Sequence, residues 1–200
     1  AGVGVVDIEG AWRVTHEDLV GKSPTLIHGA QYSAIDWIDH GTAVLGVIAA
    51  TDNAVGVVGT APAITSVRMS SVWDAGGNYH GEDAFIAAIA AMSVNDILLI
   101  EQQYGLRPAE TIDSYLDLIR LATSQGILVV EAAGNGNVDL DAWTTPGGLQ
   151  RMNRGSPDFV DSGAILVGAC TSPVPHERAW FSNFGSRIDC FAYGENVTTT

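Results

Sequence analysis

The sequence is poor in basic residues, in cysteine and in long apolar runs. One lysine and eight arginines stand against 23 acidic residues, which gives a formal net charge of −14. Such a charge opposes binding to phosphate backbones and to anionic membrane surfaces, so neither nucleic acid nor a membrane is expected as a partner. The longest apolar runs, at 43–50 and 84–92, are well short of the roughly 18 residues that span a bilayer. The sequence therefore predicts no transmembrane anchor.

Cysteine occurs only at positions 170 and 190. A bridge between Cys170 and Cys190 would close a loop of about 20 residues and would stabilise the fold by roughly 3 kcal/mol if the geometry allows it. Two buried free thiols fit the sequence equally well, so the state of the two cysteines stays open.

What the chain does contain is an alternation of short β-branched runs and longer helical patterns. The predicted strands lie at about 3–8, 64–69, 96–101, 126–133, 163–170 and 186–194, and the predicted helices near 43–50, 82–94 and 109–124. In the last of these helices, Ile112, Leu116 and Ile119 fall on one face. The alternation is typical of βαβ units, whose parallel strands need long crossovers. We expect a single α/β domain over residues 1–200, with a mostly parallel twisted sheet flanked by helices and a loop at 136–162.

A histidine stands directly before one of the apolar runs, in "DHGTAVLGVIAA" at 39–50. If the helix runs from Ala43, His40 lies at its N-terminal end, where unpaired N–H groups and positive potential favour a neutral imidazole. A neutral imidazole can act as a base. On this stretch alone, a core histidine with both nitrogens satisfied is the alternative.

Two polar residues follow predicted strands, where functional groups of an α/β sheet gather. Asp7 ends "GVGVVD" and Asn135 follows "GILVVEAAG". Taken singly, Asp7 would also fit a turn cap and Asn135 a left-handed turn residue. A dinucleotide site at the N-terminus is disfavoured, because the glycines precede the apolar run and the third glycine is missing.

In their chain order these stretches resemble the subtilisin-like serine proteases, the subtilases. The matching segments are "VVDIEG", "HEDL" at 16–19, "DHGTAV", "GVVGTAPAITSVRM" at 56–69, "AAGNG" and "FSNFGSRIDCFAYG" at 181–194. The resemblance implies a subtilisin-like fold, truncated at both ends, and serine endopeptidase chemistry. By carry-over from the family, His40 is the general base, Asp7 orients its ring and Asn135 donates to the oxyanion. The related sedolisins have Glu and Asp at the positions of His40 and Asn135, so these two residues favour the subtilisin branch.

The resemblance also implies a substrate groove, in which an extended peptide pairs between two segments at 102–105 and 131–134. The implied substrate-binding residues are Gln103, Tyr104, Gly105, Ala132, Ala133 and Gly134. "EQQYG" replaces the usual Ser-Leu-Gly, so the side-chain pockets cannot be carried over. Glu131 would favour basic substrates if it faced the groove, whereas strand alternation would turn it away.

A structural calcium site is the third implication, because "TDNAVGV" follows the histidine helix at the spacing of the family's calcium loop. Calcium takes six to eight oxygen ligands, many from carbonyls of a tight turn. The implied ligands are the side chains of Asp18 and Asn53 and the carbonyls of Thr51, Val55 and Val57. A plain Asn/Gly turn is the alternative. The family's further N-terminal ligand would precede Ala1.

The nucleophile is missing, because no serine lies in a Gly-Thr-Ser context. We therefore expect the chain to be an incomplete peptidase domain, without its serine-bearing C-terminal part, and inactive by itself. The alternative is a protease-like binding domain that has lost catalysis. The resemblance alone implies a polypeptide substrate, a pro-segment inhibitor and secretion.

Overall fold

The computed structural model describes residues 2–200 and consists of two compact units. The first unit comprises Ala1–Leu99, Gln125–Leu128 and Thr198–Thr200, and the second comprises Ile100–Ser124 and Val129–Val197. The seven strands of the main sheet divide between them, with β2-β3-β1-β4 in the first and β7-β8-β9 in the second.

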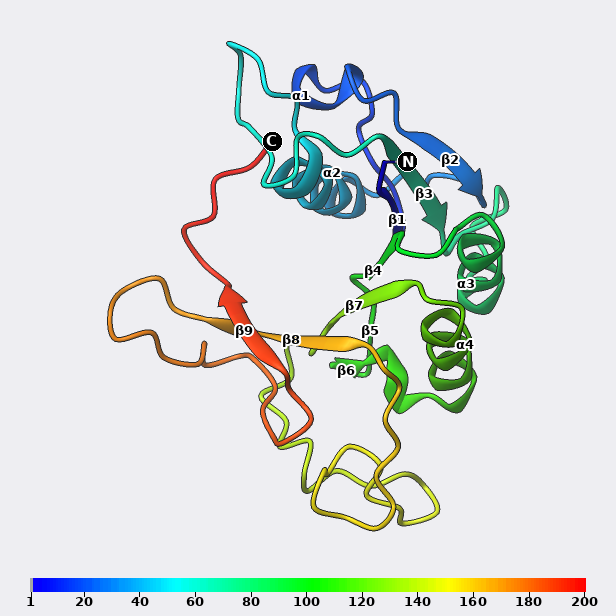
Figure 1. Cartoon of the computed structure of the whole chain (residues 1–200), viewed down its shortest axis with the longest axis vertical. Helices are drawn as coiled ribbons and strands as arrows, with labels where there is room; N and C mark the ends of the chain where they lie inside the picture. The colour runs from blue at the N-terminus through cyan, green and yellow to red at the C-terminus, as the bar shows by residue number, and fades with distance from the viewer. Residues whose placement is uncertain (1) are drawn as a thin grey trace. The chain divides into compact units, whose positions relative to one another are not determined.

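The first unit is built around the parallel strands β1, β2 and β3. Its elements are β1 (Gly4–Glu9), α1 (Glu17–Val20), β2 (Thr25–His28), α2 (Ile35–Ala49), β3 (Ser66–Ser71), α3 (Gly81–Ala90) and β4 (Ile97–Ile100), whose last residue belongs to the second unit. β1 and β2 both pair in parallel with β3. Helices α2 and α3 cover opposite faces of these strands (Figure 1).

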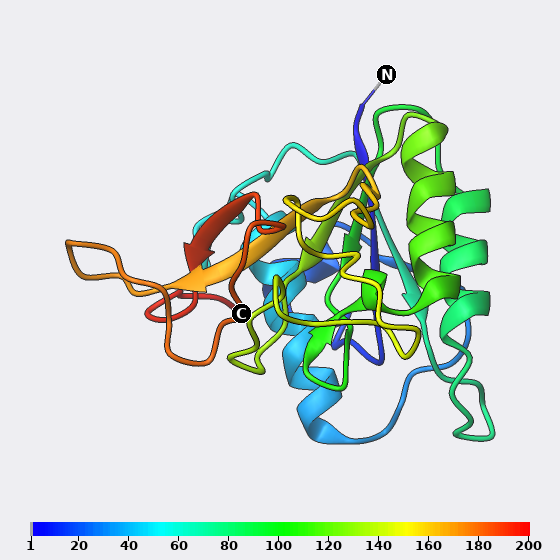
Figure 2. The same ribbon diagram turned by 90° about the horizontal axis from the view of Figure 1, so that it is seen from below.

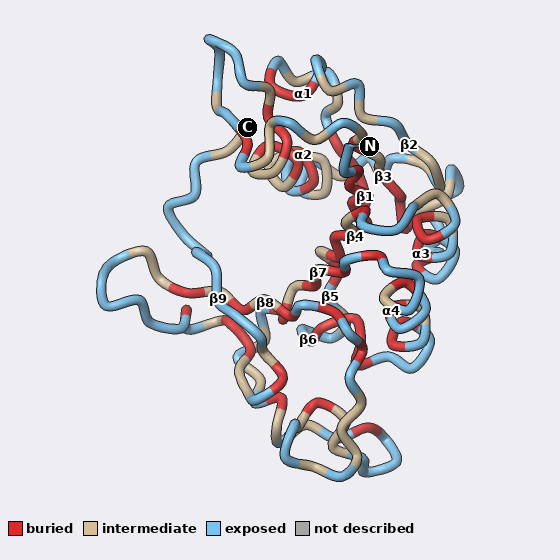
Figure 3. The backbone as a smooth tube through the Cα atoms, in the orientation of Figure 1, coloured by how far each residue is buried: buried red, intermediate tan, exposed pale blue. Residues whose placement is uncertain are grey.

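Burial explains why β1 forms at the centre of this unit. All six residues of β1 are buried, as expected for a parallel strand covered on both faces. The tube in Figure 3 is red along β1 and along most of β3. On α2 the buried residues are Gly41, Thr42, Leu45, Gly46 and Ala49, which is the stripe of a helix that packs one face on a sheet.

The second unit contains three parallel strands and a small hairpin. Its elements are β5 (Gln103–Tyr104), β6 (Arg107–Pro108), the 3-10 helix η1 (Ala109–Thr111), α4 (Asp113–Ser124), β7 (Leu128–Ala132, with Leu128 in the first unit), β8 (Ile165–Cys170) and β9 (Cys190–Tyr193). The ladder β7-β8-β9 is parallel, and β5 pairs antiparallel with β6. The long connection from β7 to β8 contains no helix or strand, as predicted, and is the yellow segment of Figure 2.

The predicted fold class is confirmed, since the sheet is mostly parallel and flanked by helices. The starts of helices α2 and α4 differ from prediction. Helix α2 begins at Ile35, eight residues before the expected Ala43. Ile112 precedes α4 in an extended conformation and is exposed, so the buried stripe of that helix is formed by Tyr115, Leu116, Ile119 and Ala122. Within residues 2–200, no helix has the length and apolar character needed to span a membrane.

Candidate active site

The carboxyl end of β1 carries two acidic side chains, Asp7 and Glu9. Both residues are buried, with 0% and 1% of their surface exposed. Because side chains alternate along a strand, residues two apart lie on the same face. Glu9 is the last residue of the strand and stands opposite Ser71 of β3. The sequence predicts a functional acid at this strand end, and the structure supplies two of them.

His40 lies on α2 and meets one of these acids. Its Nδ1 is 2.5 Å from Oε2 of Glu9, while the other oxygen of Glu9, Oε1, accepts a hydrogen bond of 2.9 Å from the Gly10 N–H. The Glu9 side chain is 2% exposed and that of His40 is 55% exposed. A carboxylate accepts from Nδ1, so the proton of the neutral ring resides there. The exposure of the ring rules out the alternative of a histidine enclosed in the core.

Asp7, expected to orient His40, forms a hydrogen bond to a different ring. The indole Nε1 of Trp12 donates to Oδ2 of Asp7 at 2.7 Å, and the backbone N–H of Trp12 donates to Oε1 of Gln31 at 2.7 Å. Asp7 therefore anchors the loop that follows β1. Glu9, a residue that the motif comparison did not single out, forms a hydrogen bond to His40. The orienting role of Asp7 stays a prediction.

The Gly-Thr pair after the histidine fixes this loop on α2. A Cβ atom at Gly41 would lie 2.8 Å from Cδ1 of Trp12, so glycine is needed for the close approach. Thr42 Oγ1 accepts from the Arg13 N–H at 2.8 Å and donates to the Ile38 carbonyl at 2.5 Å. The motif thus positions the loop against the helix turn that carries the imidazole.

The position of His40 within α2 differs from the expectation. Since α2 begins at Ile35, His40 is in the second turn, beyond the four N–H groups that a helix start leaves unpaired. The positive potential of the helix start is confined to the first turn. The ring is consequently oriented by Glu9 and not by the helix terminus.

Asn135, the expected oxyanion donor, lies in the second unit, in the loop after β7. The residue is exposed, and its backbone N–H donates to Oε1 of Gln103 at 2.9 Å. Gly134, just before it, has φ +90°, a conformation that favours glycine. A Cβ there would also lie 2.8 Å from the Leu106 carbonyl oxygen. Glycine is therefore required immediately before the candidate donor.

The loop that carries Asn135 is held by a buried asparagine, Asn183. Its Oδ1 accepts from the N–H groups of Gly136 and Val138 at 3.1 and 2.8 Å. Its Nδ2 donates to the carbonyls of Leu106 and Ala133 at 2.8 and 2.6 Å. Asn183 is fully buried and stands in the "FSNFG" segment. Its role could not be read from that segment, because its partners lie far away in the sequence.

The first expected substrate segment forms a hairpin of its own. Gln103 pairs with Pro108 and Tyr104 with Arg107, and the two residues between the strands, Gly105 and Leu106, have φ values of +55° and +66°. Positive φ at both central residues is the pattern of a type I′ turn. The departure of "EQQYG" from the family habit therefore coincides with a tight turn.

The second expected substrate segment continues the ladder of β7. Ala132 ends β7, and the Ala133 N–H donates to the Val167 carbonyl at 2.9 Å. The two segments are brought together inside the second unit by the bond from Asn135 to Gln103 and by Asn183. That the two segments form the walls of a peptide groove stays a prediction.

Comparison with known proteins identifies the family. The profile of the subtilase family, Peptidase S8, matches residues 22–200. The chain belongs to the subtilase family. It is 30% identical to Subtilisin DY of Bacillus licheniformis over 198 residues, covering 99% of this chain and 66% of that protein. It is 30% identical to Subtilisin Savinase of Lederbergia lenta, covering 93% of this chain and 62% of that one. The chain thus spans less than two thirds of the length of these relatives.

Solved structures show the same fold. A psychrophilic subtilisin-like protease, Apa1 from Pseudoalteromonas sp. AS-11, superposes with a TM-score of 0.69 at 20% identity, covering 96% of this chain and 41% of that one. The PatG macrocyclase domain superposes with a TM-score of 0.70 at 17% identity, covering 99% of this chain and 66% of that one. These likenesses establish that the chain has the subtilase fold.

Glu131 of this subtilase lies in a buried ionic cluster and not in a substrate pocket. It is fully buried, and its Oε1 accepts from the Glu110 N–H at 2.9 Å. Burial, followed by the neighbouring charge of Glu110, raises the pKa of Glu131 well above its usual value. The strand alternation has turned Glu131 inward, so the structure gives no support to a preference for basic substrates through this residue.

Arg187 is the cation of the same cluster and is also fully buried. Its Nε lies 2.7 Å from Oε1 of Glu110, and its Nη1 lies 2.7 Å from Oδ2 of Asp189. Its Nη2 donates to Ser162 Oγ at 3.1 Å and to the Ala164 carbonyl at 3.0 Å. Burial raises the pKa of Glu110, and the Arg187 charge opposes that shift. The guanidinium thus offsets the charge of the buried Glu110.

The expected calcium loop of this subtilase wraps around Asp18, which is 1% exposed. The Asp18 carbonyl accepts from the N–H and Oγ1 of Thr51 at 2.8 and 3.0 Å, and Oδ2 accepts from the Val57 N–H at 3.3 Å. A Cβ at Gly56, which has φ +61°, would lie 2.1 Å from Oδ1. The predicted loop is therefore present, and its glycine is required by the closeness of the carboxylate.

Only some of the oxygen atoms predicted to bind calcium in this loop are available to a cation. Oδ1 of Asp18 is buried and accepts no hydrogen bond within the described part of the chain. Asn53 Oδ1, by contrast, accepts from the Val55 N–H at 2.8 Å, as in a plain Asx turn. No cluster of three or more His, Cys, Asp or Glu residues suited to a metal occurs among residues 2–200. A calcium ion here would depend on Asp18 and on carbonyl oxygens.

Cys170 and Cys190 are free thiols, one buried and one exposed. Cys190 stands opposite Val167 and Cys170 opposite Tyr193, so the two cysteines are three residues out of register. Three residues correspond to about 10 Å along a strand, and a bridge needs Cα atoms within about 7 Å. The disulfide alternative is thereby excluded.

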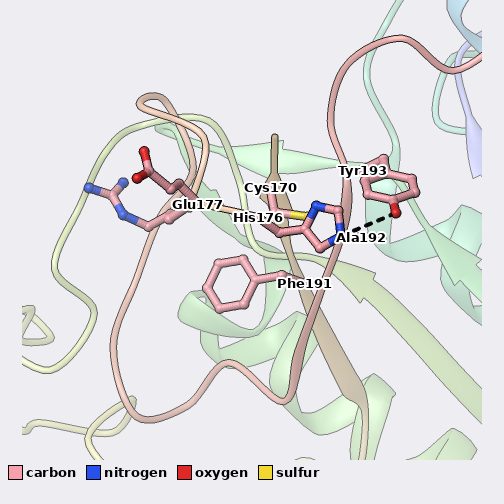
Figure 4. A pocket seen from close by; sticks show the side chains of 7 residues that line it. Cys170, His176, Glu177, Phe191, Ala192 and Tyr193 are labelled. Atoms are coloured by element: carbon pink, nitrogen blue, oxygen red, sulfur yellow. Dashed lines mark hydrogen bonds between the residues drawn. The ribbon is translucent and has the colours of Figure 1, made fainter. Parts of the chain in front are cut away.

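A pocket of about 670 Å³ lies at the ends of β8 and β9 (Figure 4). Its lining includes His176 and Tyr193, whose Nε2 and hydroxyl are 3.5 Å apart. None of the residues predicted for catalysis, substrate or metal lines this pocket.

Proposed function

We propose that the chain is the histidine-bearing part of a serine endopeptidase domain, in which His40 is the general base. The observation that carries the proposal is the 2.5 Å hydrogen bond between Nδ1 of His40 and a buried carboxylate. It fixes the ring in the tautomer whose Nε2 can accept a proton. In the subtilase family a histidine held by a carboxylate in this way is the general base of peptide hydrolysis.

The proposed reaction is acyl transfer to a serine. The serine Oγ attacks the carbonyl carbon of the substrate while its proton passes to Nε2 of His40, and the negative oxygen that forms accepts a hydrogen bond from Nδ2 of Asn135. The imidazolium then gives its proton to the departing amine. A water molecule repeats the sequence on the acyl-enzyme and releases the acid. The 200 residues contain no Gly-Thr-Ser, so the proposal assigns the nucleophile to a serine outside them.

The test uses a fluorophosphonate probe and a peptide substrate on the full-length protein. We expect one labelled serine, and we expect His40→Ala to lower kcat by about 10⁶-fold, the loss known for the triad histidine in subtilisin. His176→Ala, which removes an exposed histidine of the second unit, is the matched control and should retain labelling. An unlabelled wild-type protein would instead favour a protease-like binding domain.

The proposed substrate is a polypeptide bound in an extended conformation by the segments at 102–105 and 131–134. The support is that Gln103 of the first segment accepts a hydrogen bond from the Asn135 N–H, directly after the second segment. Asn183 also donates to the carbonyls of both Ala133 and Leu106. Gln103 also replaces the smaller residue of the family pattern. The side-chain preference of this subtilase should accordingly depend on Gln103 and Tyr104.

A structural calcium ion at the Asp18 loop is part of the same proposal. Asp18 and Asn53 would offer side-chain oxygens, and Thr51, Val55 and Val57 would offer carbonyls. The support is the buried Oδ1 of Asp18, for which the described residues provide no donor. An ion that binds only the folded state stabilises it by about 2.7 kcal/mol at a concentration of 100 Kd.

Calcium should therefore raise the Tm of the protein, and chelation should lower it. Asp18→Asn removes the charge that would hold the ion and is expected to abolish the calcium-dependent part of Tm. Asp52→Asn, an exposed acid of the same loop, is the control and should keep that shift. Differential scanning calorimetry with and without calcium measures both. An equal calcium response in the Asp18→Asn variant would show that the loop is a plain turn.

Secretion and inhibition by a pro-segment complete the proposal. Both rest on membership of the subtilase family alone.

A further inference from the structure

We infer that Glu9 is the carboxylate that positions His40 in this protein, while Asp7 supports the adjoining loop through Trp12. This assignment rests on the proposed function, because it concerns the proposed general base. It departs from the family pattern, in which an aspartate has the orienting role.

The contacts of Glu9 are those that an orienting carboxylate needs. One oxygen lies 2.5 Å from Nδ1 of His40, and the other is fixed by the Gly10 N–H at 2.9 Å. The Glu9 side chain is 2% exposed, so the carboxylate accepts the bond from the more exposed ring at a site with little water, where a charge-assisted hydrogen bond is strong. Its place as the last residue of β1 brings it to the strand end where functional groups gather.

The hydrogen bond of Asp7 to Trp12 needs an acceptor oxygen at this position and not a negative charge. Asp7 Oδ2 accepts from the indole N–H of Trp12 at 2.7 Å, and Trp12 packs against Gly41 in the turn that carries His40. Accepting from an indole needs an oxygen but no negative charge, so the carboxamide of asparagine can replace the carboxylate. Through this bond Asp7 holds the loop that packs on the turn of His40.

The role of Glu9 in the reaction is to stabilise the positive charge that forms on His40. When His40 Nε2 takes the serine proton, the ring becomes an imidazolium with protons on both nitrogens. Glu9 stays ionised and stabilises that cation without taking the proton. The other ion pair at this turn joins Arg13 and Asp39 at 3.3 Å, with side chains 51% and 62% exposed. This ion pair is open to solvent and therefore contributes little to stabilising the charge on His40.

The experiment compares Glu9→Gln, Glu9→Asp and Asp7→Asn in the full-length protein. We expect Glu9→Gln to lower kcat by about 10⁴-fold, the size of loss known for orienting carboxylates of serine proteases, with KM changed less than about threefold. Glu9→Asp withdraws the carboxylate by one methylene, and a misplacement of that size costs about 100-fold. Asp7→Asn should lower kcat less than about tenfold.

A second measurement reports on the ring itself. The ¹⁵N chemical shifts of His40, assigned by their loss in His40→Gln, distinguish a proton on Nδ1 from one on Nε2. We expect the Nδ1–H form in the wild type and in Asp7→Asn. In Glu9→Gln the amide can donate to Nδ1, so the Nε2–H form should become populated. A merely structural role for Glu9 would leave the tautomer unchanged.

Two outcomes would overturn the assignment. One is an Asp7→Asn variant that loses activity as severely as Glu9→Gln does. The other is an Nδ1–H tautomer that survives in Glu9→Gln. If the wild type has no peptidase activity and no labelled serine, the proposed function fails, whereas the tautomer measurement still decides which acid holds His40.

Discussion

Replacing Arg187 with methionine is expected to lower the free energy of unfolding by about 3–5 kcal/mol at neutral pH. Arg187 is fully buried and pairs with Glu110 and Asp189. Methionine fills a similar volume but leaves the Glu110 carboxylate without its cation in the interior. Breaking a buried pair from one side costs far more than removing an exposed one, because the remaining charge has lost its water and its partner. Urea unfolding measures the change.

The cost should depend on pH in a defined direction. Burial raises the pKa of Glu110 even with Arg187 present, and loss of the guanidinium would raise it further. A carboxyl whose pKa is higher in the folded state stabilises that state only while it is protonated, so this contribution is lost as pH rises through the folded pKa. The destabilisation by Arg187→Met should therefore be smaller near pH 4 and larger near pH 8.

Arg154→Met is the matched control, because Arg154 also pairs with Asp189. Its Nη2 lies 2.6 Å from Oδ1 of Asp189, but its side chain is 40% exposed. An exposed ion pair contributes about 1 kcal/mol or less. Equal costs for the Arg154→Met and Arg187→Met variants, or a cost independent of pH, would contradict the role given to the buried cluster.

Asn183→Ala is expected to lower the free energy of unfolding by about 3–5 kcal/mol and to loosen the loop of Asn135. The side chain makes four hydrogen bonds to main-chain groups. Each is worth about 1 kcal/mol, and a buried group left without a partner costs about 1–3 kcal/mol. Alanine removes all four at once and cannot admit much water to a fully buried site.

Hydrogen exchange gives this prediction a local readout. The amides of Gly136 and Val138 donate to Asn183 Oδ1, so their protection should fall in Asn183→Ala more than that of β8. Asn153→Ala is the control, since Asn153 makes side-chain bonds to Gly155 and Asp141 in a half-buried loop and should cost about 1 kcal/mol. Unchanged protection at Gly136 would show that other contacts hold the loop.

The elements with strong apolar patterns could be predicted from the sequence. β1, β3, β7 and β8 appear close to their predicted positions, because short runs rich in Val, Ile and Leu are typical of parallel strands. The strand β2 was missed, since "TLIH" has only four residues and none of them is fully buried. The start of α2 was missed because "IDWIDH" lacks an apolar run, although the acidic Asp36 suits a first turn.

The candidate site was less predictable than the fold. His40, Asn135 and the Asp18 loop follow from local motifs. The contact between Glu9 and His40 does not, because residues two apart lie on the same face of a strand and the sequence does not show which of them meets α2. Asn183 could not be assigned either, since its four partners come from two other segments. The hairpin turn was hidden by Leu106, a branched residue that rarely adopts positive φ.

The two acids of β1 have a consequence for comparing distant subtilases. Their Cα atoms are one strand repeat apart, about 6.6 Å, so the place of the neighbouring helix along the strand decides which of the two carboxylates meets its histidine. An alignment anchored on the aspartate column assigns the function to Asp7 and treats Glu9 as an ordinary substitution. In a homologue whose orienting acid stands two positions later, such an alignment would judge catalytic competence from the wrong residue. A structure shows which of the two acids contacts the histidine.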